Sequence, residues 1–268
     1  MSNEKILFTA IFVYIVVLST LTSLKHYCFR TFAFDFGIFV QIFWHSTHGN
    51  YMFTQPRGTP LHPTSFLGVH FSPLLMVLIP LYKLIPSPYV LLVLQTTALA
   101  LPAYFVYKIG VEVTGRERLS LIYAIGYLLY PGTLWSNWYD FHLESFIPLF
   151  TSMAYYNYLT GATTRLILSM ILLLATFERA VFIVAFFIFY IFLRETHLRR
   201  KGGIRALRPS PDVNILLIPM LILSAIYYVG SERIMAGILP ARVFIDDYYL
   251  GLLNSIFPNL QQPRIILD

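Results

Sequence analysis

The chain has 268 residues, of which 57% are hydrophobic and only 12% are charged. This composition, with a mean hydropathy of +0.67, excludes most soluble enzyme folds and indicates a polytopic helical membrane protein. The net charge of +6 does not indicate nucleic-acid binding, because six of the 19 basic residues lie between Arg194 and Arg208, beside apolar segments, as in a cytoplasmic loop. Cys28 is the only cysteine, which excludes an intrachain disulfide and a cysteine cluster for zinc or iron–sulfur.

The first apolar segment, residues 6–24, is long enough to cross a bilayer. It holds 19 residues without a charge between Lys5 and Lys25, and no small-residue cleavage site lies nearby. We therefore expect an uncleaved first transmembrane helix with its N-terminus in the cytoplasm. A long outer loop, residues 25–88, follows. Within it, residues 34–44 are apolar but too short to span, which predicts a juxtamembrane helix with Asp35 as its N-cap or first-turn residue.

The role of the next two apolar segments follows from the parity of the membrane crossings. Residues 71–85 contain two prolines, whereas residues 89–107 form the better span. Residues 108–118 carry three basic residues and are expected to be a cytoplasmic loop, so only one of the two segments crosses. We therefore expect residues 71–85 to lie at the interface or to re-enter the membrane.

Five further spans are expected in the second half of the chain. Residues 166–193 number 28, too many for one ordinary span and too few for two full ones. A single span would place the basic residues between 199 and 208 outside, so we expect two short spans that meet at a turn. The expected spans are residues 119–134, 145–159, two within 166–193, and 213–229, with an outer turn at residues 135–145 and an inner loop that ends at Arg165.

The turn between the two short spans contains Glu178 and Arg179. Spans of about 14 residues, or roughly 21 Å, do not cross a ~30 Å hydrocarbon core and leave this turn below the outer surface. Glu178 and Arg179 are therefore expected to form the floor of an outward-facing cavity. The alternative is an adjacent ion pair that seals a helix junction.

These segments predict an all-α integral membrane protein with about seven transmembrane helices and juxtamembrane helices in the first outer loop. Residues 1–230 form the transmembrane module. Residues 231–268 form an outer-face C-terminal segment, which we expect to be the start of a missing or separate C-terminal region. No internal repeat is visible, including the inverted repeat of many secondary transporters.

The ionisable residues near the membrane fall at the outer ends of segments in this topology. A charge at such a position is costly unless it pairs or lines a polar cavity, so one outward-facing site is the economical explanation. Around residues 135–145 the alternative is a polar turn among the lipid headgroups. Carboxylates can act as a general base towards a hydroxyl, and an arginine can hold a phosphate. The candidate residues are Asp35, His70, Asp140, His142, Glu144, Glu178 and Arg179.

Other chemistry is less well supported by the sequence. Four aromatic residues near these positions either stack on sugars or belong to the interfacial aromatic belt; they are Trp44, Trp135, Trp138 and Tyr139. Four histidines are too loosely spaced to indicate a metal site; they are His45, His48, His62 and His70. A Walker lysine loop, a dinucleotide glycine pattern and a serine nucleophile elbow are all absent from the sequence, so a nucleotide-driven pump is not expected.

Three motifs carry a resemblance to a known group of proteins. Phe34-Asp-Phe-Gly-Ile38, His70-Phe-Ser-Pro73 and Trp138-Tyr-Asp-Phe-His-Leu-Glu144 resemble an uncharacterised family of predicted multi-pass membrane proteins that is grouped with the GT-C glycosyltransferases. The order of segments also resembles the N-terminal seven-helix module of that superfamily. Where relatives tend to have Lys-Glu-Asp, this chain has Phe177-Glu178-Arg179.

The resemblance implies transfer of a sugar from a polyprenyl-phosphate donor to an acceptor at the outer face of the cell membrane. By position, Asp35 matches the catalytic base, and Asp140 or Glu144 matches a second acid that orients the acceptor or binds a divalent cation such as Mg²⁺ or Mn²⁺. Arg179, with His70 or His142, would hold the phosphate, and Glu178 would complete the substrate site.

Two other functions remain open from the sequence. One is an outward-facing transporter or lipid-handling protein, for which an inner-facing counterpart of the acidic cluster would argue. The other is a non-catalytic subunit completed by a second chain. The expected partners are the lipid bilayer, the polyprenyl-linked sugar and a possible second chain that supplies the C-terminal part.

Overall fold

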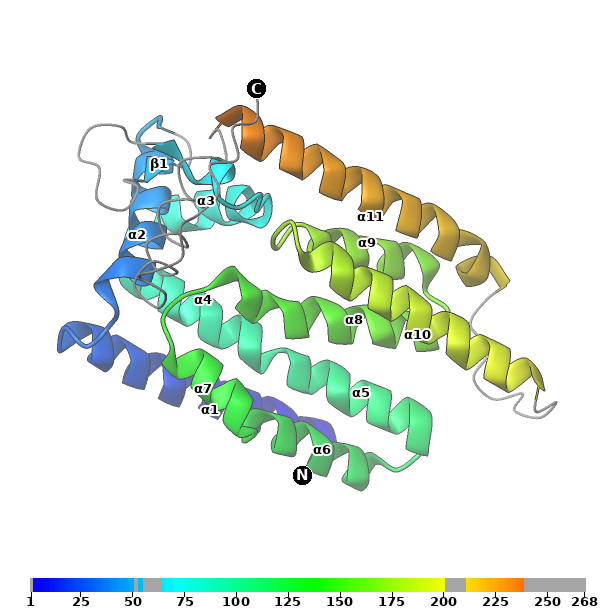
Figure 1. The fold of residues 1–268 in the computed structure, drawn as a ribbon. Helices are drawn as coiled ribbons and strands as arrows, with labels where there is room; N and C mark the ends of the chain where they lie inside the picture. The colour runs from blue at the N-terminus through cyan, green and yellow to red at the C-terminus, as the bar shows by residue number, and fades with distance from the viewer. Residues whose placement is uncertain (1, 51–52, 55–63, 201–210, 239–268) are drawn as a thin grey trace, which may run out of the picture.

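The computed structural model describes residues 2–50, 53–54, 64–200 and 211–238, and it confirms the all-α class. The two strands, β1 (Phe53–Thr54) and β2 (Thr64–Ser65), form one short antiparallel pair. Two short 3-10 helices, η1 (Phe66–Gly68) and η2 (Leu143–Phe146), lie beside the longer helices. The α-helices, drawn in Figure 1, are α1 (Asn3–Tyr27), α2 (Ala33–Thr47), α3 (Leu74–Leu84), α4 (Pro88–Ala100), α5 (Pro102–Thr114), α6 (Glu117–Leu128), α7 (Pro131–Trp138), α8 (Ile147–Leu159), α9 (Thr163–Leu174), α10 (Ala180–Arg200) and α11 (Pro211–Ile238).

Three stretches of the described chain are long and apolar enough to cross a membrane. They are Asn3–Tyr27, Pro88–Thr114, which joins α4 and α5, and Leu217–Ile238 in α11. α3 and α9 are apolar but shorter. The chain is therefore a helical protein with three candidate spans, and the count of seven stays a prediction.

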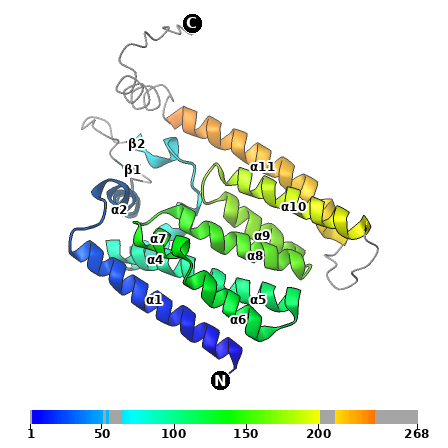
Figure 2. The same ribbon diagram turned by 60° about the horizontal axis from the view of Figure 1, so that its bottom comes forward.

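The bundle has two ends that polar contacts define. At the N-terminal end, Lys108 of α5 lies 2.9 Å from Glu4 of α1, and Asn3 donates a hydrogen bond to Glu117 of α6. At the opposite end, which we call the site end, Lys25 of α1 pairs with Asp140, between α7 and η2. Because α1 and the joined α4 and α5 connect these ends in opposite directions, α2 and α3, which come between them in the chain, lie at the site end (Figures 1 and 2).

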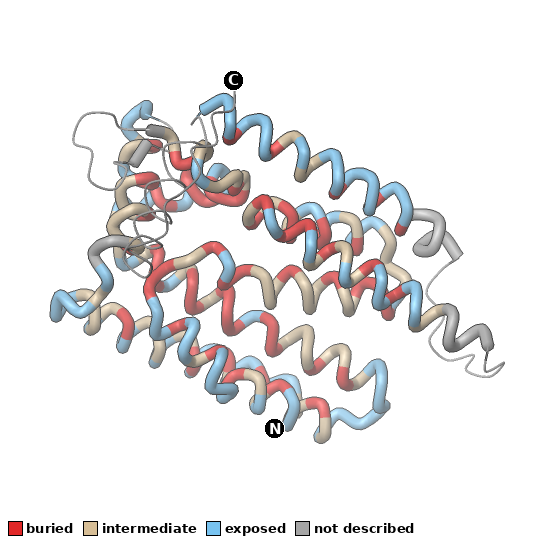
Figure 3. The backbone as a smooth tube through the Cα atoms, in the orientation of Figure 1, coloured by how far each residue is buried: buried red, intermediate tan, exposed pale blue. Residues whose placement is uncertain are grey.

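The packing forms two neighbouring cores. The smaller joins α1 to α5 and α6 through residues such as Leu7, Ala103 and Ala124. The larger contains α2, α3, α8, α9 and α10, with α4 and α11 against them. Large apolar side chains stay exposed on the outside of the bundle, among them Phe12 of α1 and Ile218 of α11. Figure 3 shows that much of α11 is exposed. An exposed apolar surface of this extent fits a protein whose surroundings are lipid.

Prolines and glycines place the helix boundaries. Pro88, Pro102 and Pro131 each begin a helix, where the missing N–H costs no hydrogen bond. Gly115 ends α5 in the left-handed conformation, with φ of 66°. Gly110 allows α5 to approach α6 closely, because a Cβ there would lie 2.7 Å from Ser120 Oγ.

Several predicted boundaries were wrong, and each has a local cause. Residues 108–114 are helical, so the expected loop at 108–118 shrinks to the turn around Gly115. Residues 119–134 are not one helix, because the residue before Pro131 avoids the helical conformation: Tyr130 has ψ of 128° and separates α6 from α7. The helical residues 135–138 belong to α7, although a turn was expected there.

The boundaries near the C-terminus also differ from the prediction. The turn at residues 175–179 lies where it was expected, but the two helices are unequal, with 12 residues in α9 and 21 in α10. α10 includes Arg194, expected in a loop, because this guanidinium donates to Tyr158 of α8 at 2.8 Å. α11 runs through residue 230 to Ile238. Residues 239–268, the rest of the expected C-terminal segment, lie outside the described residues.

Candidate functional site

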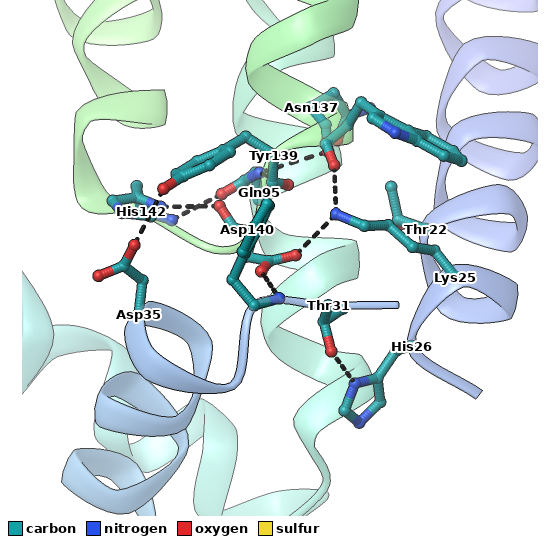
Figure 4. Close-up of polar contacts among 12 residues, drawn as sticks. Thr22, Lys25, His26, Thr31, Asp35, Gln95, Asn137, Tyr139, Asp140 and His142 are labelled. Carbon is teal, nitrogen blue, oxygen red and sulfur yellow. Dashed lines mark hydrogen bonds and ion pairs between the residues drawn. The ribbon is translucent and has the colours of Figure 1, made fainter. Parts of the chain in front are cut away.

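A buried ion pair joins three elements at the site end. Asp140 is only 1% exposed, and its Oδ1 lies 3.0 Å from Lys25 Nζ at the end of α1. Its Oδ2 accepts a hydrogen bond from the backbone N–H of Phe32, the N-cap residue of α2. Lys25 also donates to the Trp138 carbonyl at 2.8 Å. We call Lys25, Phe32, Trp138 and Asp140 the Asp140 corner (Figure 4), and it ties α1 to α2 and to the end of α7.

Gln95 of α4 sets the path of the chain around the Asp140 corner. Its amide Nε2 donates to the carbonyls of Ser136, Asn137 and Tyr139 at 3.0, 3.5 and 3.2 Å. Its Oε1 accepts from the His142 backbone N–H at 2.7 Å. Gln95 is 1% exposed, so its amide needs partners inside the protein, and it finds them in these four backbone groups. The sequence analysis missed Gln95, although an amide inside an apolar helix is itself a signal of a partner.

Asp35 lies in a more open setting than Asp140. It occupies the first turn of α2, as predicted, and Phe32 is the N-cap. The Tyr139 hydroxyl donates to Asp35 Oδ2 at 2.9 Å, and this is the hydrogen bond found for Asp35 among the described residues. The bond raises the pKa of the Tyr139 phenol, because the neutral phenol is the donor. Asp35 is partly exposed, and no cation pairs with it in the described part of the chain.

His142 lies beside the same tyrosine. Its Nδ1 is 2.8 Å from the Asp140 carbonyl, which can only accept, so Nδ1 carries a proton and Nε2 faces away from this contact. The imidazole centroid is 5.0 Å from the Tyr139 ring. Asp35, Tyr139 and His142 therefore form one group, which we call the Asp35 group (Figure 4).

A second polar group lies at the turn between α9 and α10. Glu178 Oε1 lies 3.1 Å from His70 Nδ1, and Glu178 Oε2 accepts from the Phe71 backbone N–H at 3.2 Å. Burial alone would raise the pKa of the Glu178 carboxyl, but these hydrogen bonds outweigh it and the pKa is lowered. Arg179 Nε is 3.7 Å from Glu178, and 72% of its side chain is exposed. This arrangement fits the alternative given for Glu178 and Arg179, an adjacent ion pair at a helix junction, here the turn between α9 and α10.

The two polar groups are neighbours across aromatic rings. Phe39 packs 5.7 Å from the His142 ring and 5.6 Å from Phe66, which lies 5.6 Å from His70. Both phenylalanines are buried. Asp35, Asp140 and His142 thus come together around Tyr139, while His70, Glu178 and Arg179 gather on the far side of this aromatic pair. A single cavity lined by both groups stays a prediction.

Glu144 and His48 stand apart from both groups. Glu144 is exposed in η2, and its side chain has no hydrogen bond or ion pair in the described part of the chain. The ring of His48 stacks on Trp44 at 4.3 Å, and His62 lies outside the described residues. Across the ranges that the structure describes, no three His, Cys, Asp or Glu side chains converge on a possible metal site.

Comparison with known proteins places the chain in a family. A family model described as "Predicted membrane protein (DUF2079)" matches residues 25–242. The chain belongs to this DUF2079 family. No curated protein and no solved structure matches the chain.

The DUF2079 match contains both polar groups. It begins at Lys25, the cation of the Asp140 corner, and extends beyond Arg179 through the whole of α11. The family description supports a membrane location and assigns no reaction. The chemistry of the Asp35 group indicates what this end of the protein can do. A partly exposed carboxylate beside a phenol and an imidazole can accept a proton from a bound hydroxyl.

Proposed function

We propose that this DUF2079 protein is a membrane glycosyltransferase of the GT-C type, which transfers a sugar from a polyprenyl-phosphate donor to an acceptor at the outer face of the cell membrane. The observation that carries the proposal is the contrast between two carboxylates at one end of the bundle. Asp140 is buried and paired with Lys25, whereas Asp35 is partly exposed with a single described hydrogen bond. A general base needs such a reachable carboxylate.

The proposal includes seven membrane crossings with the N-terminus in the cytoplasm. Helices α8, α9, α10 and α11 pack one against the next, and successive helices run in opposite directions (Figure 2). With α1, the joined α4 and α5, and α6 with α7, these make the seven. Basic residues favour the N-terminal end as the cytoplasmic side; they include Lys5, Lys108, Arg116, Arg118 and Arg165.

In the proposed reaction, the acceptor hydroxyl attacks the anomeric carbon of the donor sugar. The bond from that carbon to the phosphate oxygen breaks, and polyprenyl phosphate leaves with the bonding electron pair. Asp35 takes the hydroxyl proton, so charge and atoms balance without protonation of the leaving group. Tyr139 holds one oxygen of Asp35 and leaves the other free to face the acceptor.

For the phosphate, the geometry favours His142 over the other two candidates. His142 contacts Tyr139 directly, whereas His70 and Arg179 lie beyond Phe39 and Phe66. Because Nδ1 of His142 donates to the Asp140 carbonyl, Nε2 donates to a phosphate only when the ring is protonated. Glu178 fixes His70, and Glu144 remains the candidate for the acceptor or a divalent cation.

A transporter or lipid-handling protein is the second candidate function. The observation that bears on it is a cluster of ionisable side chains away from the site end. There Arg194 donates to the Tyr158 hydroxyl at 2.8 Å, and this hydroxyl donates to Glu195 Oε1 at 2.5 Å. These groups satisfy each other, so they form a tie between α8 and α10 and not an open binding site. The inner counterpart that a transport pathway needs is therefore not evident among the described residues.

The orientation can be tested with the native thiol. Cys28 is exposed just after α1, at the site end. A membrane-impermeant maleimide should label Cys28 in intact cells, whereas a Cys28→Ser protein carrying Glu112→Cys, in the last turns of α5, should be labelled only after the cells are opened. The reverse pattern would place the Asp35 group in the cytoplasm and reject the outer-face reaction.

The reaction is tested with purified wild-type protein in lipid nanodiscs. Polyprenyl phosphate carrying a radiolabelled sugar is mixed with a panel of hydroxyl acceptors, and both label transfer and free polyprenyl phosphate are measured. We expect equal amounts of transferred sugar and released polyprenyl phosphate. Folded protein that releases none with any donor and acceptor would reject the transferase and favour a transporter or a non-catalytic subunit.

A further inference from the structure

The turn that ends α1 has an unusual backbone conformation. Among the described residues, φ is positive at three glycines and at one other residue, Phe29, where it is 55°. The Phe29 N–H donates to the His26 carbonyl at 2.9 Å, and the Arg30 N–H donates to the Lys25 carbonyl at 3.0 Å. These two bonds form the Schellman motif, in which the left-handed residue is usually glycine. A bulky residue in this conformation costs stability, which indicates a role beyond capping α1.

The packing of the protein does not account for a phenylalanine at this position. Its side chain is 95% exposed, so it adds nothing to either hydrophobic core. Tyr27 is 71% exposed, and Arg30 is exposed without a carboxylate partner among the described residues. Two aromatic rings and a guanidinium therefore extend from this one turn towards the surroundings of the protein.

The level of this turn relative to a bilayer follows from the length of α1. α1 is a candidate membrane span, and its uncharged residues 6–24 measure roughly 29 Å, close to the ~30 Å thickness of a hydrocarbon core. Lys25 therefore lies at the boundary of the hydrocarbon core. The hydrogen bond from the Arg30 N–H to the Lys25 carbonyl brings Arg30 back to the same level. The turn thus lies at the level of the lipid headgroups.

Lys25 is not available to the lipid phosphates. Its Nζ is turned inward to Asp140 and to the Trp138 carbonyl, and only 7% of its side chain is exposed. A lysine or arginine at the end of a span ordinarily extends to the headgroups, and here Arg30 is the exposed cation at that level. Aromatic rings beside such a cation are typical of residues at the membrane interface.

We propose that Phe29, Tyr27 and Arg30 form an anchor in the phospholipid layer at the site end, with both rings near the ends of the acyl chains and the guanidinium on a lipid phosphate. Phospholipid is the chosen partner because the turn directly follows a candidate span. The Asp140 corner ties α1 to α2, so the anchor also sets the depth at which α2 and Asp35 lie. This inference rests on the membrane location of the DUF2079 family and not on the proposed reaction.

The native thiol can report the depth of the anchor, because Cys28 is the only cysteine and is exposed beside Phe29. Full-length protein with a nitroxide on Cys28 is placed in vesicles of phosphatidylcholine and phosphatidylglycerol. Electron paramagnetic resonance then measures the ratio of collisions with oxygen to collisions with a water-soluble nickel complex. This ratio should lie between that of a label in water and that of a Cys28→Ser protein labelled at Val17→Cys, on an exposed part of α1.

Two results of this measurement would reject the anchor. One is a ratio equal to that of a label in water, which would place the turn outside the lipid. The other is dipolar broadening between labels together with few collisions of either kind, which would show that a second copy of the chain covers the turn.

Three substitutions at Phe29 separate the role of the ring from that of the backbone. Phe29→Ala and Phe29→Gly both remove the ring and should shift the ratio at Cys28 towards the value in water, whereas Phe29→Trp should keep the wild-type ratio. Glycine alone relieves the left-handed conformation, so Phe29→Gly should unfold in detergent about 2–4 °C above Phe29→Ala.

The Phe29 variants can each contradict the proposal. An unchanged ratio in Phe29→Ala would show that the ring does not hold the turn in the lipid. Failure of Phe29→Ala to fold would show that the ring belongs to the packing of the protein. Equal unfolding midpoints for Phe29→Gly and Phe29→Ala would remove the cost that indicates a role for this ring, and would also overturn the inference.

Discussion

The two carboxylates Asp140 and Asp35 both lie at the site end, but their surroundings differ. Asp140 is enclosed by Lys25 and the N–H of Phe32, the N-cap of α2, whereas Asp35, on that same helix, bonds to Tyr139 among the described residues and is partly exposed. A buried, fully paired carboxylate stabilises a corner and is poorly placed to receive a proton from substrate. A partly exposed carboxylate with one anchoring hydrogen bond is held in position and stays reachable. Two carboxylates that lie near each other in the fold therefore need not have the same role.

The largest expected effect is on stability, from removing the buried carboxylate. Asp140→Ala leaves the Lys25 ammonium and the Phe32 N–H without their partner, which should cost about 3–5 kcal/mol of unfolding free energy. Thermal unfolding in detergent, followed by size exclusion, measures this loss. The double variant Lys25→Met with Asp140→Leu should recover part of it, because no uncompensated charge then remains. An Asp140→Ala protein with the wild-type midpoint would show that the corner is not structural.

A smaller loss is expected from Gln95→Leu. Leucine has a similar volume but removes the partner of the His142 N–H and of the Tyr139 carbonyl, and such unsatisfied groups cost about 1–3 kcal/mol. Thr97→Val is the matched control on the same helix, because Thr97 bonds only to its own helix, at Val93, and its loss should stay within about 0.5 kcal/mol. Equal midpoints for the two variants would mean that Gln95 does not set the path of residues 136–142.

The smallest of these effects is the pH dependence of the second polar group. The lowered pKa of Glu178 means that its contribution to stability is present above the ordinary carboxyl pKa and is lost as the pH falls through the lowered value. Unfolding midpoints between pH 3 and 6 should therefore drop less steeply for Glu178→Gln than for wild type. Parallel curves would show that the contact between His70 and Glu178 contributes nothing.

The sequence was sufficient for features that a single segment encodes. Three such features could be predicted: the apolar run of α1, the short apolar segment of α2 with Asp35 in its first turn, and the break at Glu178 between α9 and α10. Each depends on hydrophobic length or on a charge inside it. Helix ends were less well predicted, because a charge such as that of Lys108 or Arg194 does not end a helix when Glu4 or Tyr158 pairs with it.

Partners far apart in the chain could not be predicted in the same way. Lys25 was interpreted as the basic flank of a span, but its Nζ lies 3.0 Å from a carboxylate 115 residues away. His70 and Glu178 were both expected at the site, yet Phe39 and Phe66 lie between them and the Asp35 group. For Gln95, the sequence does not show which groups it bonds to, because its partners at residues 136–142 lie more than 40 positions away in the chain.

The rate of sugar transfer by Asp35→Asn tests the central claim most directly. Asparagine is nearly isosteric and can still accept the Tyr139 hydrogen bond, so the folded protein should lose at most about 1 kcal/mol. The amide takes no proton, and loss of a general base should lower the rate by roughly 10²- to 10⁴-fold. Glu112→Gln, the same change on the exposed surface of α5, should transfer at the wild-type rate. Transfer by folded Asp35→Asn protein at the wild-type rate would contradict the claim that Asp35 is the base.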